Sequence, residues 1–250
     1  MAPSRQLFHT FAVVDSFLPD HIFREVAAFV EHAKYHPTPS GTSIWHSVEQ
    51  ENPSEGIDTF AWACPAVLSA LPPQGRDAML ASAGILLHPS HTIIDHVIEA
   101  VCQEADLSAS LLGARGTDWL GLLASAFKYH TGARATWHND ENEYRGAFIY
   151  YVHENWERSW GGELMIGDDT AKVGDGVFVL PVPNRLVILK GGTPHSVASV
   201  SIRSGGRART SVAGFFVTEA LSRKLISALR PPTGDHPQHE DDVVVSGKSI

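Results

Sequence analysis

Short apolar runs fill the stretch from residue 119 to 217, and their spacing limits what the chain can fold into. Gly, Pro, Asn and Asp separate the runs, and these residues form turns. The runs are WLGLLASAFKY, GAFIYYV, GELMIG, GVFVLP, RLVILK and TSVAGFFV. Short strands at this spacing favour an all-β sandwich or barrel. We therefore expect a β core in this part of the chain.

Helical patterns stand on both sides of this predicted core. Residues 18–33 repeat apolar side chains along one helix face and have an acceptable cap at Asp20, and residues 90–105 show the same periodicity. A closing helix is predicted after the core, capped by Thr218. The fold class expected is therefore α+β but mainly β, with a core that N-terminal helices buttress.

One elaborated domain accounts for the 250 residues. We expect the domain to span residues 1–233. Within it, residues 1–118 supply a strand, helices and a segment able to serve as a lid, residues 119–217 form the β core and residues 218–230 form the closing helix. The polar residues 234–250 are expected to be a flexible tail.

The charge and hydropathy of the chain exclude several classes of partner. Its formal net charge is -9, and its Lys and Arg residues form no long basic stripe, so we expect no nucleic-acid partner. No segment approaches the ~20 apolar residues that cross a bilayer, and the first residues lack a signal-peptide pattern. We expect a soluble, cytoplasmic protein with no membrane partner and an undetermined oligomeric state.

Potential metal ligands occur in ATWHND and GGTPHSV. On a strand, His138 and Asp140 point the same way because side chains alternate between faces. His195 follows the RLVILK run and a turn, so a later strand can bring it to the same place. Two histidines and one carboxylate match the facial triad of non-haem Fe(II) oxygenases. Zinc uses the same ligand types, so the triad alone does not name the metal.

Arg209 narrows the choice between iron and zinc. The strand pattern of RARTSVAGFF places Arg209 and Ser211 on one face, and an arginine pointing into a β core is costly unless it meets an anion. A guanidinium binds a carboxylate through two parallel hydrogen bonds. A 2-oxo acid that chelates iron at one end has a distal carboxylate to offer, whereas a zinc hydrolase needs no such group.

The chain resembles the Fe(II)/2-oxoglutarate-dependent dioxygenases, in particular their prolyl-4-hydroxylase-like branch. The resemblance covers about residues 119–217 and rests on YHTGARATWHND, RGAFIYYVHENWERSWGGELMI, PVPNRLVILKGGTPHSV and GRARTSVAGFF, which occur in the order typical of that family. It implies a distorted double-stranded β-helix, a relative of the jelly rolls and cupins.

The resemblance also implies the cofactors and the residue roles. Fe(II) would be held by His138, Asp140 and His195, with 2-oxoglutarate and O2 as co-substrates. The far carboxylate of 2-oxoglutarate would be bound by Arg209 with help from Ser211, and Tyr129 would line the co-substrate pocket. The loop between His195 and Arg209 is longer than is usual in this branch, which leaves Arg207 as an alternative to Arg209.

The reaction implied is hydroxylation of an unactivated C–H bond, with release of succinate and CO2. Desaturation and cyclisation at the same site stay open. We expect a small amino-acid-like, peptide or natural-product substrate rather than a protein substrate. The alternatives are a prolyl-type hydroxylase of protein side chains and, more remotely, a jelly roll that binds a metal without oxidative catalysis.

Overall fold

The computed structural model describes residues 3–38, 45–51, 59–71, 73–140, 144–167 and 176–229. The strands are β1 (Ser4–Leu7), β2 (Phe11–Asp15), β3 (Tyr35–Pro37), β4 (Trp45–Glu51), β5 (Thr59–Ala63), β6 (Ile85–Leu87), β7 (Gly121–His138), β8 (Tyr144–Tyr151), β9 (Leu164–Gly167), β10 (Gly176–Val179), β11 (Leu186–Lys190), β12 (His195–Val197) and β13 (Arg209–Val217). The helices are α1 (Asp20–His32), α2 (Pro65–Ser69), α3 (Arg76–Ser82), α4 (Ile94–Leu107), α5 (Ala109–Leu112) and α6 (Glu219–Leu229), with 3-10 turns η2 (Arg158–Trp160) and η3 (Ile202–Ser204).

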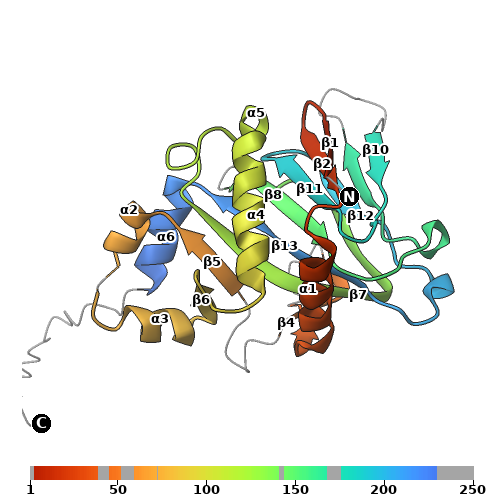
Figure 1. Ribbon diagram of the computed structural model, residues 1–250, viewed down its shortest axis with the longest axis horizontal. Coiled ribbons are helices and arrows are strands. Elements are labelled where there is room, and N and C mark those ends of the chain that lie inside the picture. The colour runs from red at the N-terminus through yellow and green to blue at the C-terminus, as the bar shows by residue number, and fades with distance from the viewer. Residues whose placement is uncertain are drawn as a thin grey trace, which may run out of the picture.

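The described strands join one curled sheet (Figure 1). The main path runs β1-β2-β11-β8-β13-β7-β12-β9-β10, while β4 and β5 also pair with β7, β3 with β4, and β6 with β5. All pairs are antiparallel except β5 with β6. Neighbours such as β11 and β8 are distant in sequence, so long-range pairing builds this sheet.

The long strand β7 connects the two ends of the curl. Residues 121–129 pair with β13, whereas Ala135 and His138 pair with β12. Between these regions lies Gly132, whose φ of +86° is readily adopted only by glycine. One strand therefore contributes side chains to both ends of the space that the sheet encloses.

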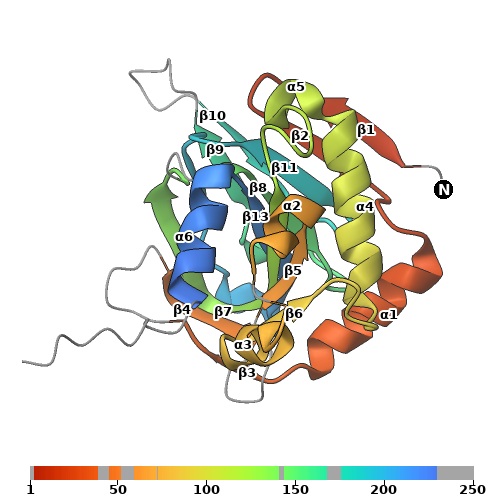
Figure 2. The ribbon, with the colours of Figure 1, turned by 90° about the vertical axis from the view of Figure 1, so that its left-hand side faces the viewer.

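The two faces of the sheet carry separate hydrophobic cores. Phe148 and Tyr150 of β8 pack in the core that includes residues of α1, α4 and α5, and Figures 1 and 2 show α1 and α4 lying across one face of the sheet. Ile149 and Tyr151 belong to the second core, inside the curl. The period-two alternation of an antiparallel strand produces this division, and the inner face carries the candidate site.

Several local predictions can be compared with the observed elements. Asp20 is the first residue of α1 and makes no capping hydrogen bond, so the predicted cap is wrong; the carboxylate instead lies in the first turn, where the helix dipole favours a negative charge. Thr218 Oγ1 accepts a hydrogen bond from Leu221 N–H at 3.4 Å at the start of α6. The predicted tail, residues 234–250, lies outside the described residues, and the domain extent of 1–233 stays a prediction.

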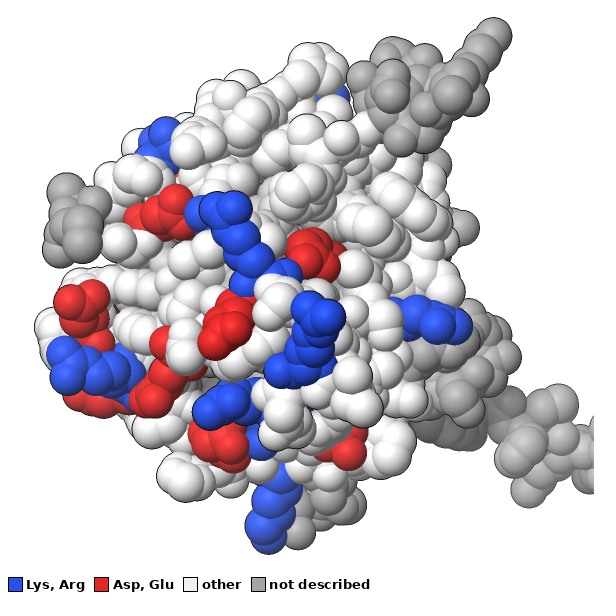
Figure 3. Space-filling view, turned by 90° about the vertical axis from the view of Figure 1, so that its right-hand side faces the viewer, with Lys and Arg blue, Asp and Glu red and all other residues white. Residues whose placement is uncertain are grey.

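The surface carries both signs of charge side by side. On the face shown in Figure 3, the Lys and Arg side chains lie among Asp and Glu side chains, and the described part of this face shows no extended surface of one sign. Among the described helices, none combines the length and the apolar character needed to cross a membrane.

Candidate metal centre and its pocket

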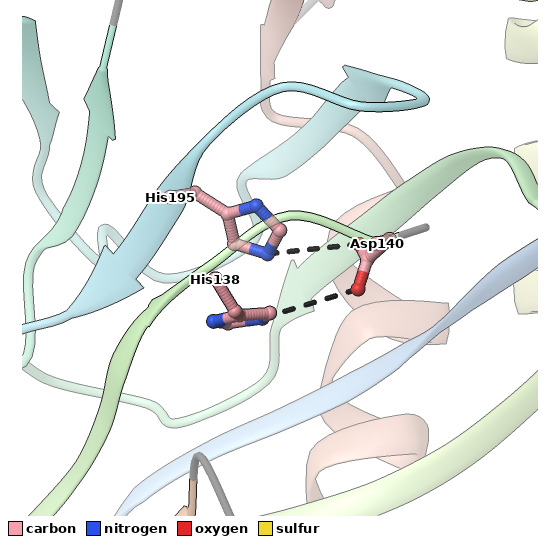
Figure 4. A group of neighbouring side chains, drawn as sticks. All are labelled: His138, Asp140 and His195. Carbon is pink, nitrogen blue, oxygen red and sulfur yellow. Dashed lines mark ion pairs between the residues drawn. The ribbon is translucent and has the colours of Figure 1, made fainter. Parts of the chain in front are cut away.

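The three side chains predicted as metal ligands converge beyond the end of β7 (Figure 4). His138 is the last residue of β7 and pairs with His195, the first residue of β12, and their ring centroids are 4.2 Å apart. The Asp140 carboxylate lies 3.9 Å from His138 Nε2 and 3.6 Å from His195 Nε2. One ligand atom from each residue falls within 4.8 Å of the others, so three donors face a common centre.

Backbone carbonyls orient both imidazole rings. His138 Nδ1 lies 2.7 Å from the Thr136 carbonyl oxygen, and His195 Nδ1 lies 2.9 Å from that of Thr193. Because a carbonyl only accepts, each Nδ1 carries the hydrogen and each Nε2 presents a lone pair towards Asp140. Metal-binding histidines have their second nitrogen fixed in this way. The two rings are thus held in the tautomer that a metal requires.

The backbone around Asp140 differs from the prediction. The sequence pattern placed Asp140 on the same strand as His138, but β7 ends at His138. Gly192 N–H donates a 3.3 Å hydrogen bond to the Asp140 carbonyl oxygen, which ties Asp140 to the turn that leads into β12. This contact, rather than strand alternation, brings the carboxylate against His195.

Burial shifts the pKa values of this group. It raises the pKa of the Asp140 carboxyl, against the opposing effect of the two histidines, and it lowers the pKa of the His195 imidazole. Both shifts disfavour charge, because the site is largely removed from water. A divalent cation at the centre would reverse the effect on Asp140 by stabilising its carboxylate.

A small pocket extends from the two histidines to Arg209. Apart from these three, its walls are mostly apolar and come from β7, β8, β9, β12 and β13. The remaining lining residues are Phe127, Tyr129, Ala135, Ile149, Leu164, Val197, Ser211 and Ala213.

Arg209 is a buried cation in this pocket. Its residue is 1% exposed, and its guanidinium carbon lies 4.5 Å from the Tyr129 ring centroid and 4.8 Å from that of Tyr151. Among the described residues, no acidic side chain forms an ion pair with Arg209, and its Nε has no hydrogen-bond partner. A buried cation with an unmet donor is costly by itself, so the pocket suits an anionic ligand.

Two tyrosines enclose that guanidinium. Burial raises the pKa of Tyr129, and the charge and hydrogen bond of Arg209 oppose the rise only in part, so Tyr129 is a neutral phenol at pH 7. The Tyr151 hydroxyl is buried and has no hydrogen-bond partner among the described residues. Sequence analysis missed Tyr151, although its parity with Ile149 on β8 would have placed it on the inner face.

The choice between the two arginines follows from their surroundings. Arg207 is exposed, and its guanidinium carbon lies 5.2 Å from the ring centroid of Trp160. Arg209 shares its face of β13 with Ser211, which is also 1% exposed and lines the same pocket. The structure thus brings the predicted residues together in one place, while their chemical roles remain predictions.

His153 lies behind Arg209, outside the pocket. The ring is buried, with Nε2 2.6 Å from the Pro181 carbonyl oxygen and Nδ1 3.2 Å from that of Thr210. Burial lowers the pKa of His153 to about 4. A neutral imidazole donates through one nitrogen only, and the shorter contact assigns that hydrogen to Nε2.

The fold and the site together combine a jelly-roll core, three convergent side chains of metal-ligand type and a pocket with a buried arginine. Residues 124–217 match the family model of the 2OG-Fe(II) oxygenase superfamily. This part of the chain is thus similar to a superfamily of dioxygenases that uses Fe(II), 2-oxoglutarate and O2. No match was found among curated proteins.

Solved structures share the fold. A prolyl-4-hydroxylase from Pseudomonas putida is similar with a TM-score of 0.55 and 19% identity, covering 84% of this chain and 94% of that one. A prolyl hydroxylase from Trichoplax adhaerens, in complex with a hypoxia inducible factor peptide fragment, has a TM-score of 0.54, 14% identity and 87% coverage of both chains. A 2OG-Fe(II) oxygenase family oxidoreductase from Burkholderia pseudomallei has a TM-score of 0.54 and 13% identity, covering 83% of this chain and 85% of that one. The predicted double-stranded β-helix fold is confirmed.

Proposed function

We propose that this chain hydroxylates an unactivated C–H bond of a small amino-acid-like, peptide or natural-product substrate, with release of succinate and CO2. In this proposal His138, Asp140 and His195 hold Fe(II), and Arg209 binds the distal carboxylate of 2-oxoglutarate. The metal, once bound, supplies the activation of O2 and the oxidative decarboxylation of the 2-oxo acid.

One observation carries the proposal: Arg209 is a buried cation without an acidic partner among the described residues, in the same pocket as the two histidines. A hydrolytic metal site has no need of this cation, whereas a dicarboxylic 2-oxo acid has one charged group for each end of the pocket. Ser211 and Tyr129 add hydroxyl groups to the Arg209 end. The protein residues thereby orient the co-substrate, and the apolar walls exclude water from the reacting groups.

The role of Asp140 rests on its place between the imidazoles. Its carboxylate supplies the negative charge that two neutral histidines lack, and the distances to both Nε2 atoms are below 4 Å. Replacement by alanine removes one of three protein ligands and leaves the histidines without a charged partner. We expect Asp140→Ala to weaken Fe(II) binding at least 100-fold, measured by calorimetry without oxygen.

The test of the co-substrate role is optical and needs no primary substrate. Fe(II) and then 2-oxoglutarate are added to the protein without oxygen, and the weak visible charge-transfer band of a chelated 2-oxo acid is recorded. We expect the band in the wild type and its loss in His138→Ala. Iron binding without any band would reject the proposal and favour a non-oxidative metal site.

A second candidate function is hydroxylation of a protein side chain. It is supported by fold likeness to a prolyl hydroxylase whose structure contains a peptide, a likeness that extends to the fold alone. Mass spectrometry of proteins from cells that lack or overproduce the enzyme separates the two candidates. An added oxygen at one site of one protein would replace the small-molecule proposal, whereas an oxidised metabolite without such a site would support it.

A further inference from the structure

A β-bulge changes which side chain of β8 lies on the inner face of the sheet. In the pairing with β13, Phe216 stands opposite Gly146 and Val217 stands opposite Tyr144, so Arg145 has no partner of its own. Strict alternation from Tyr151 and Ile149 would turn Arg145 inward. The extra residue inverts that order and places Tyr144 on the inner face, and bulges next to active sites commonly re-aim a side chain in this manner.

Tyr144 meets Phe215 on this face. Their ring centroids are 4.1 Å apart with an interplanar angle of 24°, which is a stacked pair. Phe215 packs against the inner core but is only partly buried, and Tyr144 is also partly buried. Burial raises the pKa of Tyr144, and the negative charge of Asp140 adds to that rise. The pair therefore stands within electrostatic reach of the proposed iron ligand and keeps ring surface open.

The opening of the pocket can be located from burial along β13. Arg209 and Ser211 are each 1% exposed, whereas Ala213 and Phe215, on the same face, are only partly buried. From Arg209 to Phe215 the strand rises ~20 Å. The inner face thus runs from a buried end at the arginine to a partly exposed end at the aromatic pair, which is called the open end below.

We propose that Tyr144 and Phe215 form the wall against which the primary substrate packs, and that this wall receives an uncharged aliphatic side chain or ring. The inference rests on the proposed function, because it takes the three proposed iron ligands near the wall to be the reacting centre. It adds the substrate class and two residues that determine specificity.

The uncharged class follows from the side chains that surround the open end. Phe127 and Ala213 continue the apolar surface of the aromatic pair. The cation that regular alternation would place there, Arg145, instead donates to the Leu112 carbonyl oxygen at 2.7 Å and lies 3.9 Å from Asp118. Among the described residues that line the pocket, the one Lys or Arg is Arg209, which lies at the buried end. Apolar walls of this kind bind carbon-rich groups through excluded water and close packing.

The experiment uses the oxygen-free Fe(II) and 2-oxoglutarate complex of the full chain. Nα-acetyl methylamides of leucine, lysine and aspartate are titrated in, and the shift of the visible band reports their binding. We expect the leucine probe to bind at least tenfold more tightly than either charged probe. Phe215→Ala and Tyr144→Ala are expected to weaken the leucine probe at least tenfold, whereas Tyr144→Phe, which keeps the ring, is expected to stay within threefold.

Phe178→Ala serves as the matched control, because Phe178 is an aromatic residue of β10 that is 69% exposed. It is expected to change no titration. A wild-type protein without the visible band overturns the proposed function itself. A normal band combined with preference for a charged probe, no binding of the leucine probe, or equal binding by wild type and the two alanine variants overturns the substrate class and the wall.

Discussion

Replacement of Arg209 by methionine separates a ligand-binding role from a structural one. In a buried pair, removal of one charged partner costs about 2–5 kcal/mol, much of it from the charge left behind. In the variant, Tyr129 and Ser211 still line the pocket near the distal carboxylate of 2-oxoglutarate. We therefore expect a loss of about 3 kcal/mol in binding free energy, within this range. This corresponds to a loss of roughly 100- to 200-fold in 2-oxoglutarate affinity.

The same substitution has a different effect on the ligand-free protein. Desolvation of the guanidinium costs several kcal/mol, and its stacking on Tyr129 and Tyr151 returns about 2 kcal/mol per ring. These effects nearly cancel, so we expect Arg209→Met to move the Tm of the ligand-free protein by no more than about 4 °C. A purely structural arginine would instead lower that Tm severely when removed.

Thermal melts with and without 2-oxoglutarate measure both effects in one assay. At a ligand concentration near 100 times Kd, binding adds ~2.7 kcal/mol, or roughly 5–10 °C for a domain of this size. Wild type and Arg207→Ala are expected to show this increase in the presence of Fe(II), and Arg209→Met is not. Retention of the full increase in Arg209→Met, or its loss in Arg207→Ala, would refute the assignment of the anion site.

Two further substitutions test the surroundings of the pocket. A Cβ on Gly162 would lie 2.8 Å from Arg209 Cδ, so Gly162→Ala is expected to raise the 2-oxoglutarate concentration for half-saturation at least fivefold. Gly132 has a similar positive φ but open space around it, so Gly132→Ala is expected to lower Tm without changing half-saturation. Equal half-saturation in the two variants would contradict the contact with Arg209. For His153, the folded pKa is about 4 and the ordinary value 6.5, so its contribution is present above pH 6.5 and is lost as the pH falls through about 4. At ~1.4 kcal/mol per pH unit this contribution to the free energy of unfolding amounts to about 3 kcal/mol. Urea melts at pH 7 and pH 4 should show a smaller loss of unfolding free energy for His153→Gln than for wild type. An equal loss in both proteins would assign the acid sensitivity to other groups.

The parts of the fold that depend on local pattern could be predicted from the sequence. The short apolar runs of β8, β11 and β13 and the helical periodicity of α1 and α4 can be recognised from neighbouring positions in the sequence. Long-range strand order is different, because the pairing of β11 with both β2 and β8 depends on contacts between distant segments. The runs themselves predict no such pairing, and only the double-stranded β-helix fold implied by the family resemblance was available from the sequence.

The residues of the candidate site likewise differ in whether local pattern or long-range contacts position them. His138, His195 and Arg209 are strand residues whose faces follow from period-two alternation, so their convergence could be predicted once the strands were placed. Asp140 lies beyond the last residue of β7, and its position depends on a hydrogen bond to Gly192, more than fifty residues away. Its predicted proximity to the histidines agrees with the structure, although the strand-based reason was wrong.

Tyr144 shows why alternation alone fails at the entrance. Counting by twos from Tyr151 leads through Ile149 and Ala147 to Arg145, which predicts a cation at the open end and hence an anionic substrate. The bulge at Arg145 reverses the order within a single residue, and the guanidinium goes to Leu112 and Asp118 instead. A one-residue irregularity thus exchanges a charged wall for an aromatic one, and with it the class of substrate that the same metal centre would oxidise. Deletion of Arg145 removes the extra residue but leaves Tyr144 opposite Val217 on the inner face. We therefore expect both the leucine probe and the visible band of the 2-oxoglutarate complex to persist in this variant, and loss of leucine binding with the band intact would contradict the wall.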